Sequence, residues 1–123
     1  MLNLSEKHSM IQKIAEKIAK EKVAPRAKEI DSTGAFPWDL IDVYKKHGFL
    51  YLMLPERFGG LDGDITSLCL VTEELAKVSG ASSLIPLAHH VGVMPIMVAA
   101  NDEQKEYLYN KIIDPEKMYI VAF

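Results

Sequence analysis

The sequence predicts an all-α fold, a bundle of five to six helices in an orthogonal or up-down arrangement. Apolar residues recur at steps of three and four along most of the chain, which is the period of amphipathic helices. The hydrophobic fraction of 49% and the charged fraction of 25% suit a soluble domain with one core. A length of 123 residues fits one domain and is short for two.

The first helix is predicted from Ser5 to Ile30, with Ser5 as its N-cap. Pro25 lies inside this pattern and lacks the amide that would reach the carbonyl of Glu21. We therefore expect a kink or a restart at this point. The apolar stripe that predicts the helix consists of Ile11, Ile14, Ala15, Ile18, Ala19, Val23, Ala27 and Ile30.

The second helix is predicted from Pro37 to His47, because proline suits the first position of a helix. The dense apolar run over residues 49–54 is either a short helix or an extended buried connection, and periodicity does not separate the two. Residues 55–64 are rich in turn formers. Their glycines match neither a Walker loop nor the dinucleotide fingerprint, so a chain reversal is favoured over a phosphate site.

The third helix is predicted from Ile65 to Val78, with Asp64 as its N-cap and Gly80 as its end. The fourth helix follows from Ser82 to Ala100 and is apolar nearly all round. A helix of that kind belongs at the centre of a bundle.

The fifth helix begins at Asn101, where Gln104 three residues later is typical of a capping box. Its predicted inward residues are Tyr107, Leu108 and Ile112. Residues 118–123 are β-prone and have no confident strand partner upstream. We therefore expect a sheet-forming domain to follow them.

Charge and cysteine content narrow the class of protein. A net charge of −3 argues against a nucleic-acid binder. The single cysteine, Cys69, cannot form an internal disulfide, and the first residues lack the pattern of a secretory signal. The apolar stretch from Leu84 to Ala100 contains two histidines, which are costly in lipid, so no membrane span is predicted. These features favour a cytoplasmic protein.

No catalytic or metal-binding constellation is predicted from the residues alone. Glu73 and Glu74 diverge on a helix, so we expect one to be solvated and the other to form an ion pair or a cap. His89 and His90 are expected to diverge in the same way and lack the spacing of a metal site. Cys69 is expected to be a small buried apolar residue.

The order of several short motifs resembles the N-terminal helical domain of the acyl-CoA dehydrogenase family. The resemblance covers nearly the whole chain. The motifs are Val23–Ala27 with Ile30 and Asp31, then Phe36–Pro37, Gly48–Phe49, Leu54–Gly60, Glu73–Ala76, Asp102–Lys105 with Leu108, and Ala122–Phe123. The resemblance implies that residues 1–117 form that helical domain and that 118–123 begin the first strand of a β-barrel middle domain.

The resemblance also implies a function. Family members are FAD-dependent oxidoreductases of fatty acid metabolism that oxidise acyl-CoA thioesters between the α and β carbons. A glutamate base and most of the FAD site belong to other parts of such enzymes, so this chain alone is expected to be inactive. Electrons pass to an electron-transferring flavoprotein, and the parent enzymes are homotetramers or homodimers.

The resemblance assigns part of the acyl pocket to the fourth helix. It places one pocket wall at Ser83, Leu84, Leu87, Ala88 and Val91. The alternative is that this face packs against neighbouring helices. Phe123 matches a flavin-contacting position. Two other functions stay open: a non-enzymatic helical interaction module, and a flavin-dependent monooxygenase or nitroalkane oxidase of the same fold.

Overall fold

Helices and turns make up the part of the chain that the computed structural model describes, which is residues 3–114 and residue 116. No strand occurs among those residues, so the all-α prediction is confirmed. The expected strand over 118–123 lies outside the described residues. The elements are α1 (Glu6–Ile18), the π-helical turn η1 (Ala19–Val23), α2 (Ala24–Thr33), α3 (Trp38–Lys46), the 3₁₀ turn η2 (Glu56–Phe58), α4 (Ile65–Ala76), α5 (Gly80–Ala99) and α6 (Asp102–Ile112).

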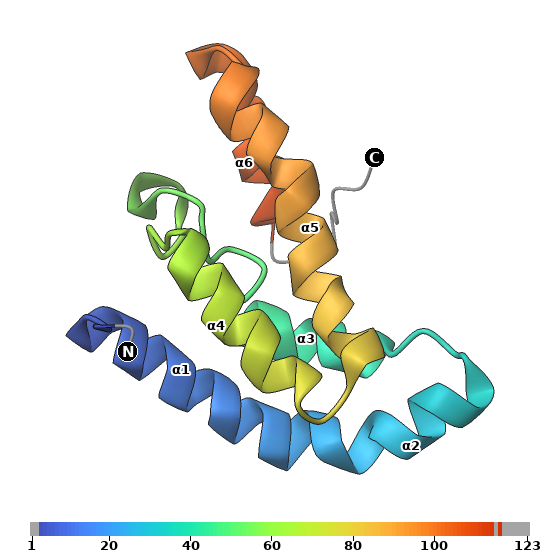
Figure 1. Ribbon diagram of the computed structural model, residues 1–123. Helices are drawn as coiled ribbons and strands as arrows, with labels where there is room; N and C mark the ends of the chain where they lie inside the picture. The colour runs from blue at the N-terminus through green and yellow to red at the C-terminus, as the bar shows by residue number, and fades with distance from the viewer. Residues whose placement is uncertain (1–2, 115, 117–123) are drawn as a thin grey trace.

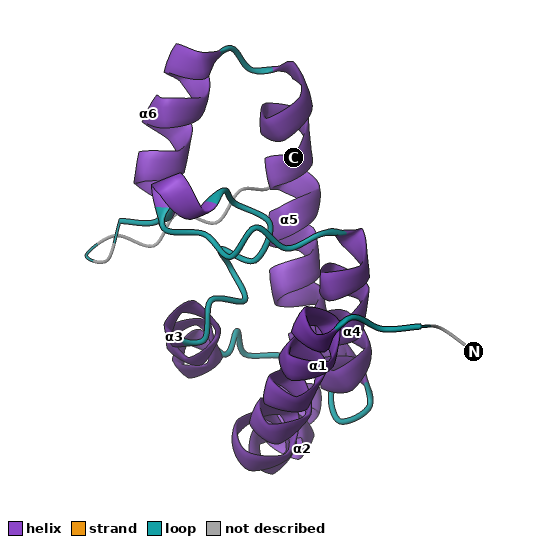
Figure 2. Ribbon diagram, turned by 90° about the vertical axis from the view of Figure 1, so that its left-hand side faces the viewer, coloured by secondary structure: helices purple, strands orange, loops and turns teal. Residues whose placement is uncertain are grey.

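Helices α1 and α2 together form one long bent rod along the bottom of the molecule (Figure 1). Helix α4 lies against α1, and α5 packs on α4. Helix α6 folds back beside α5 as the second arm of a hairpin (Figure 2). Helix α3 contacts both α5 and η1. Helix α5 contacts α2, α3, α4 and α6, as expected of a central helix, but one of its sides is exposed, which corrects the prediction of a helix at the centre of the bundle.

The bend in the rod coincides with Pro25. The amide of Ala24 donates to the carbonyl of Ala19, five residues earlier, which is the hydrogen bond of a π-helix. Pro25 then takes the second position of α2, where its missing amide costs little. The predicted restart is confirmed, and the chain stays helical across it.

The predicted helix starts carry the expected caps. Ser5 accepts from the amide of His8, and Asp64 accepts from the amide of Ser67. Asn101 and Gln104 form the reciprocal bonds of a capping box. The prediction that Gly80 ends the helix after Asp64 is wrong. That helix, α4, ends at Ala76, and Gly80 is the first residue of α5.

The segment of residues 49–54, named here the central turn, is neither a helix nor an extended connection. It is a run of turns in which Leu54 donates to the carbonyl of Tyr51 at 3.1 Å. Loop 59–63 closes onto it, with Gly63 donating to the carbonyl of Leu52 at 2.7 Å. A Cβ at Gly60 would lie 2.0 Å from the carbonyl oxygen of Leu54, so only glycine fits there. The predicted chain reversal is confirmed.

Buried side chains form two adjoining core clusters. The larger joins α1, η1, α2, α3, α4 and the central turn. The smaller consists of Leu54, Val93, Tyr109 and Ile112. Two predicted core residues are wrong: Ile14 is 42% and Tyr107 61% exposed. Tyr109 is buried in place of Tyr107, because it lies on the side of α6 that packs on Phe58. The ring centroids of Tyr109 and Phe58 are 5.0 Å apart.

Candidate functional site

An exposed apolar line runs along α5. The exposed fraction is 57% at Leu84, 41% at Val91 and 85% at Val98, and Ala88 and Pro95 are also exposed. These five positions follow one another at steps of four and three, which places them on one side of the helix. We name them the outer face of α5. The described residues leave this face exposed.

The five residues predicted to line an acyl pocket divide between two sides of the helix. Leu84, Ala88 and Val91 lie on the outer face. Ser83 is buried, and its hydroxyl donates to the carbonyl of Gly80 at 2.7 Å. Leu87 is half-buried against the larger core cluster. The structure therefore brings three of the five together, and Phe123 lies outside the described residues.

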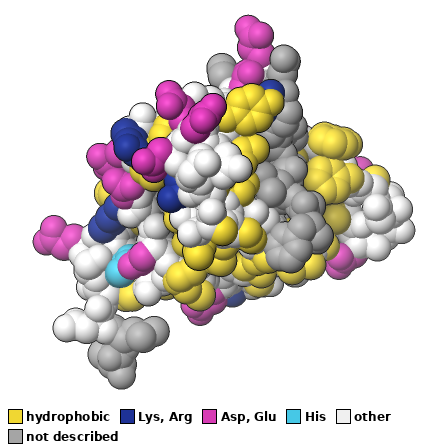
Figure 3. Space-filling model, turned by 90° about the horizontal axis from the view of Figure 1, so that it is seen from above, with side chains coloured by type: hydrophobic (Ala, Val, Ile, Leu, Met, Phe, Trp, Pro, Cys, Tyr) yellow, Lys and Arg dark blue, Asp and Glu magenta, His cyan; other side chains and the backbone are white. Residues whose placement is uncertain are grey.

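The predicted pocket wall stopped at Val91 and left out Pro95 and Val98, which continue this line. The spacing contained the signal, since 91, 95 and 98 repeat the steps that join 84, 88 and 91. Viewed from above, hydrophobic side chains reach the surface over the middle and right of the molecule, and Asp and Glu gather mainly at its upper left (Figure 3).

The opposite side of α5, its inner face, is unusually polar for a buried surface. Its buried residues are Ser82, Ser83, Pro86, His89, His90, Gly92 and Val93. The hydroxyl of Tyr44 donates to the carbonyl of Ser82 at 3.2 Å, and burial raises the pKa of Tyr44. This contact joins α5 to α3.

His89 and His90 are both fully buried on this inner face. Each donates from its Nε2 at 2.8 Å, His89 to the carbonyl of Leu50 and His90 to that of Phe49. The expectation that the two diverge is wrong, because their ring centroids lie 5.3 Å apart. A carbonyl only accepts, so each Nε2 carries the proton. The pair fixes the central turn to α5.

Glu73 and Glu74 behave as predicted. Glu74 is 5% exposed and accepts from Gln12 Nε2 at 3.0 Å and from Lys77 Nζ at 2.7 Å. Glu73 is exposed, 3.7 Å from the same lysine. The buried carboxylate thus joins α1 to α4 and is a structural contact. Cys69 is exposed, which corrects the prediction, because Leu68, Val71 and Leu75 form the buried side of α4 instead.

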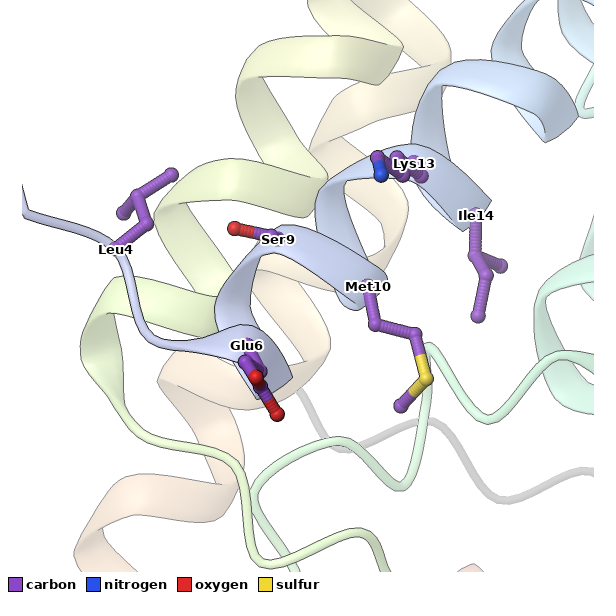
Figure 4. Close-up of a pocket in the computed structure, with 6 residues that line it drawn as sticks. All are labelled: Leu4, Glu6, Ser9, Met10, Lys13 and Ile14. Atoms are coloured by element: carbon purple, nitrogen blue, oxygen red, sulfur yellow. The ribbon is translucent and has the colours of Figure 1, made fainter.

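Several surface depressions occur away from the outer face, and two of them are lined in part by apolar residues of α1 or α5. One of about 410 Å³ lies on α1 and the residues before it (Figure 4), lined by Leu4, Glu6, Ser9, Met10, Lys13 and Ile14. The other, of about 210 Å³, lies between residues 34–37 and the start of α5. The first is built by a single helix and does not enclose a ligand as a substrate pocket would.

Metal chemistry has no visible support in the described part of the chain. No group of three or more His, Cys, Asp or Glu side chains gathers there.

By length and composition, α5 is apolar enough to cross a membrane. Within this fold, 44% of that stretch is buried.

Comparison with known proteins identifies the family. The family model "Acyl-CoA dehydrogenase, N-terminal domain" matches residues 5–116. An acyl-CoA dehydrogenase of Bacillus subtilis is 32% identical over 111 residues, which cover 89% of this chain and 29% of the relative. The cyclohex-1-ene-1-carbonyl-CoA dehydrogenase of Geobacter metallireducens is 32% identical over 86% of this chain and 28% of its own length.

A solved structure agrees. The butyryl-CoA dehydrogenase of Megasphaera elsdenii superposes with a TM-score of 0.84 at 28% identity, covering 96% of this chain and 32% of that one. The chain therefore spans about 30% of the length of the relatives it matches. Since the family model covers nearly all of its described residues, the chain belongs to the acyl-CoA dehydrogenase family and corresponds to the N-terminal domain of its members.

Proposed function

We propose that this chain is the N-terminal helical domain of a flavin-dependent acyl-CoA dehydrogenase and that the outer face of α5 forms one wall of its acyl pocket. The observation that carries the proposal is the exposed line of Leu84, Ala88, Val91, Pro95 and Val98. Its relatives include proteins named for acyl-CoA and cyclohexenecarbonyl-CoA oxidation.

The dimensions and chemistry of the outer face suit a hydrocarbon tail. From Leu84 to Val98 the helix rises about 20 Å at 1.5 Å per residue. The face carries no charged or hydrogen-bonding side chain, so it presents nothing that a buried alkyl chain would leave unsatisfied. Each methylene removed from water against it would contribute about 0.8 kcal/mol to binding.

The role of this domain in the reaction is to exclude water and to orient the substrate. A thioester held with its tail along α5 would present its α and β carbons to groups outside the described residues. FAD, when bound, would supply the hydride acceptor. We propose that the catalytic base and most of the FAD site lie beyond this chain.

The remaining assignments extend the same proposal. We propose an electron-transferring flavoprotein as electron acceptor, a homotetramer or homodimer as the assembly, and a role in fatty acid metabolism. A cytoplasmic location is proposed because the single cysteine does not require an oxidising compartment.

The wall is tested by Leu84→Phe in the protein at its natural length, assayed with FAD and an artificial electron acceptor. The larger ring should shorten the longest acyl chain that fits. We expect kcat/KM for long acyl-CoA substrates to fall about tenfold or more, with short substrates within about twofold. Equal kcat/KM losses for all chain lengths would contradict the wall.

The matched control is Ile14→Phe, a similar enlargement at an exposed apolar position of α1. It should leave the chain-length profile unchanged. Wild-type protein should purify yellow and bleach when acyl-CoA is added. Protein that binds FAD but is reduced by nitroalkanes, or that hydroxylates with oxygen, would instead identify a same-fold oxidase or monooxygenase.

A non-enzymatic interaction module is the second candidate. The exposed Met10 and Ile14, which line the depression on α1 in Figure 4, are the observation that favours it. Protein that cannot be reconstituted with FAD would support this function over the first.

A further inference from the structure

Loop 59–63 contains the only Asp–Gly pair in the sequence, Asp62–Gly63. The side chain of an aspartate can be attacked by the backbone nitrogen of the next residue. Glycine permits this attack best, because no Cβ shields its nitrogen. Asp62 is exposed and has a left-handed backbone with a φ of 46°, which is uncommon for a residue other than glycine. The loop therefore presents a chemically sensitive pair at the surface.

The reaction at such a pair rearranges the main chain and needs only water. The Gly63 nitrogen bonds to Cγ of Asp62 and loses its proton, while one carboxyl oxygen leaves as water and a five-membered succinimide ring closes. Water then adds to the former backbone carbonyl of Asp62, and the bond from that carbon to nitrogen breaks. The product is isoaspartate, in which the chain runs through Cγ. No atom is gained or lost overall, and nothing is oxidised.

The closed loop engages both reacting groups elsewhere. The amide of Gly63, whose nitrogen must attack, donates to the carbonyl of Leu52 at 2.7 Å. The Oδ1 atom of Asp62 accepts from the amide of Glu56 at 3.2 Å. Succinimide formation must break both hydrogen bonds, so it requires the loop to leave the central turn.

Helix α1 adds a second contact that keeps the loop closed. The Nζ atom of Lys7 donates to the carbonyl of Leu61 at 2.8 Å and to that of Asp62 at 3.1 Å. The amides of the same two loop residues donate to the carbonyls of Tyr51 and Leu54. The loop is therefore held between α1 and the central turn, and contacts on both sides oppose its opening.

We propose that Asp62–Gly63 is a site of spontaneous isoaspartate formation, that the closed loop protects it, and that conversion prevents the loop from closing again. Isoaspartate adds one methylene to the main chain between the amides of Asp62 and Gly63. The packing leaves little space for it, since a Cβ at Gly63 would lie 2.6 Å from the carbonyl oxygen of Leu52. The site goes beyond the proposed dehydrogenase function and does not depend on it.

The protection is tested on the protein at its natural length, incubated at physiological temperature and neutral pH. Isoaspartate at position 62 is quantified after digestion by liquid chromatography and mass spectrometry. A synthetic peptide of residues 56–68 is the open reference. Because the reaction passes through local opening, Asp62 should convert more than about tenfold more slowly in the folded protein than in the peptide.

The variant Lys7→Met tests the contact from α1. It removes both hydrogen bonds to the loop and should accelerate conversion of Asp62 about fivefold, the effect of one net hydrogen bond on the opening equilibrium. The matched control Lys13→Met makes the same change at another exposed position of α1 and should leave the rate unchanged.

Ageing of the unfolded protein tests the second half of the proposal. The protein is held in urea until much of Asp62 has converted and is then refolded, and amide exchange in residues 49–54 is followed by mass spectrometry. Converted molecules should exchange these amides at least about tenfold faster than unconverted molecules of the same sample. Asp62→Gly cannot form isoaspartate and suits the left-handed backbone, so it should regain slow exchange after the same treatment.

Any of three results would overturn the proposal. The first is a peptide that forms no isoaspartate or reacts less than about tenfold faster than the folded protein. The second is a rate that Lys7→Met does not raise, and the third is a converted protein whose central turn exchanges as slowly as the unconverted one. If Lys7→Met does not fold, the comparison of wild-type protein with the peptide still decides whether the loop protects the site.

Discussion

The two sides of α5 differ from the usual pattern of a helix at a protein surface. The inner face buries two histidines and two serines, while the outer face exposes leucine, valine and proline. A helix that packs only within its own domain normally buries its apolar side. Each inner-face polar group named above has its hydrogen-bond partner within the described chain. The described chain leaves the outer face exposed. The inner face therefore stabilises this domain, and the outer face is available for something the described residues do not supply.

The largest expected effect comes from placing a charge on each face in turn. Val93→Asp puts a carboxylate into the smaller core cluster, where Val93 is fully buried. The free energy of unfolding of the 123-residue chain should fall by about 3–5 kcal/mol, because a buried charge without a partner is strongly destabilising. Urea unfolding followed by circular dichroism measures it.

The matched control is Val91→Asp, two residues away on the outer face, where the side chain is 41% exposed. It should change the same free energy by less than about 0.5 kcal/mol. Similar losses for both variants would show that the outer face is also buried within this chain, and the contrast between the faces would fail.

A smaller effect is expected where a single polar contact of the inner face is removed. Tyr44→Phe deletes the hydroxyl that donates to the carbonyl of Ser82 and keeps the buried ring. The free energy of unfolding should fall by about 1 kcal/mol, the net contribution of one buried hydrogen bond. Val43→Ala on the same helix, at a half-buried apolar position, tests whether any change in α3 produces that loss. An unchanged stability in Tyr44→Phe would mean that this contact does not hold α5 in place.

The smallest effect on stability is expected from making the outer face polar. Leu84→Ser combined with Val98→Ser should leave the free energy of unfolding within about 0.5 kcal/mol of wild type, because both side chains are largely exposed. Binding of a dye that fluoresces on exposed apolar surface should decrease. Thermal unfolding and dye titration of the same samples measure the two quantities. A clear drop in stability would assign this face to the fold.

Most of the helical framework could be predicted from the sequence because its signals are local. The caps at Ser5, Asp64 and Asn101 depend on residues three positions apart. Pro25 predicts the bend at its own position, because proline has no amide for the helical hydrogen bond. The resemblance named Leu84, Ala88 and Val91 as part of an acyl wall, and that role stays a prediction.

What could not be predicted depends on contacts between distant residues. His89 and Leu50 are 39 positions apart, so no local pattern indicates their hydrogen bond. Tyr107 is a different case: Tyr109 lies three residues before the buried Ile112 and Tyr107 lies five before it, so the helical period favours Tyr109, which packs on the ring of Phe58. Cys69 has apolar neighbours in sequence yet faces solvent, because the packing of α1 on α4 selects the adjacent residues.

The π-helical turn before Pro25 has a consequence for the alignment of the long rod. A regular helix turns about 100° per residue, so 19 residues would leave Ile30 about a quarter-turn away from Ile11. The turn at Ala19–Val23 takes up one extra residue and rotates the following side chains back by about that amount. Both isoleucines are buried as a result. A homologous rod one residue shorter at this point would keep the same two side chains in register as an uninterrupted α-helix.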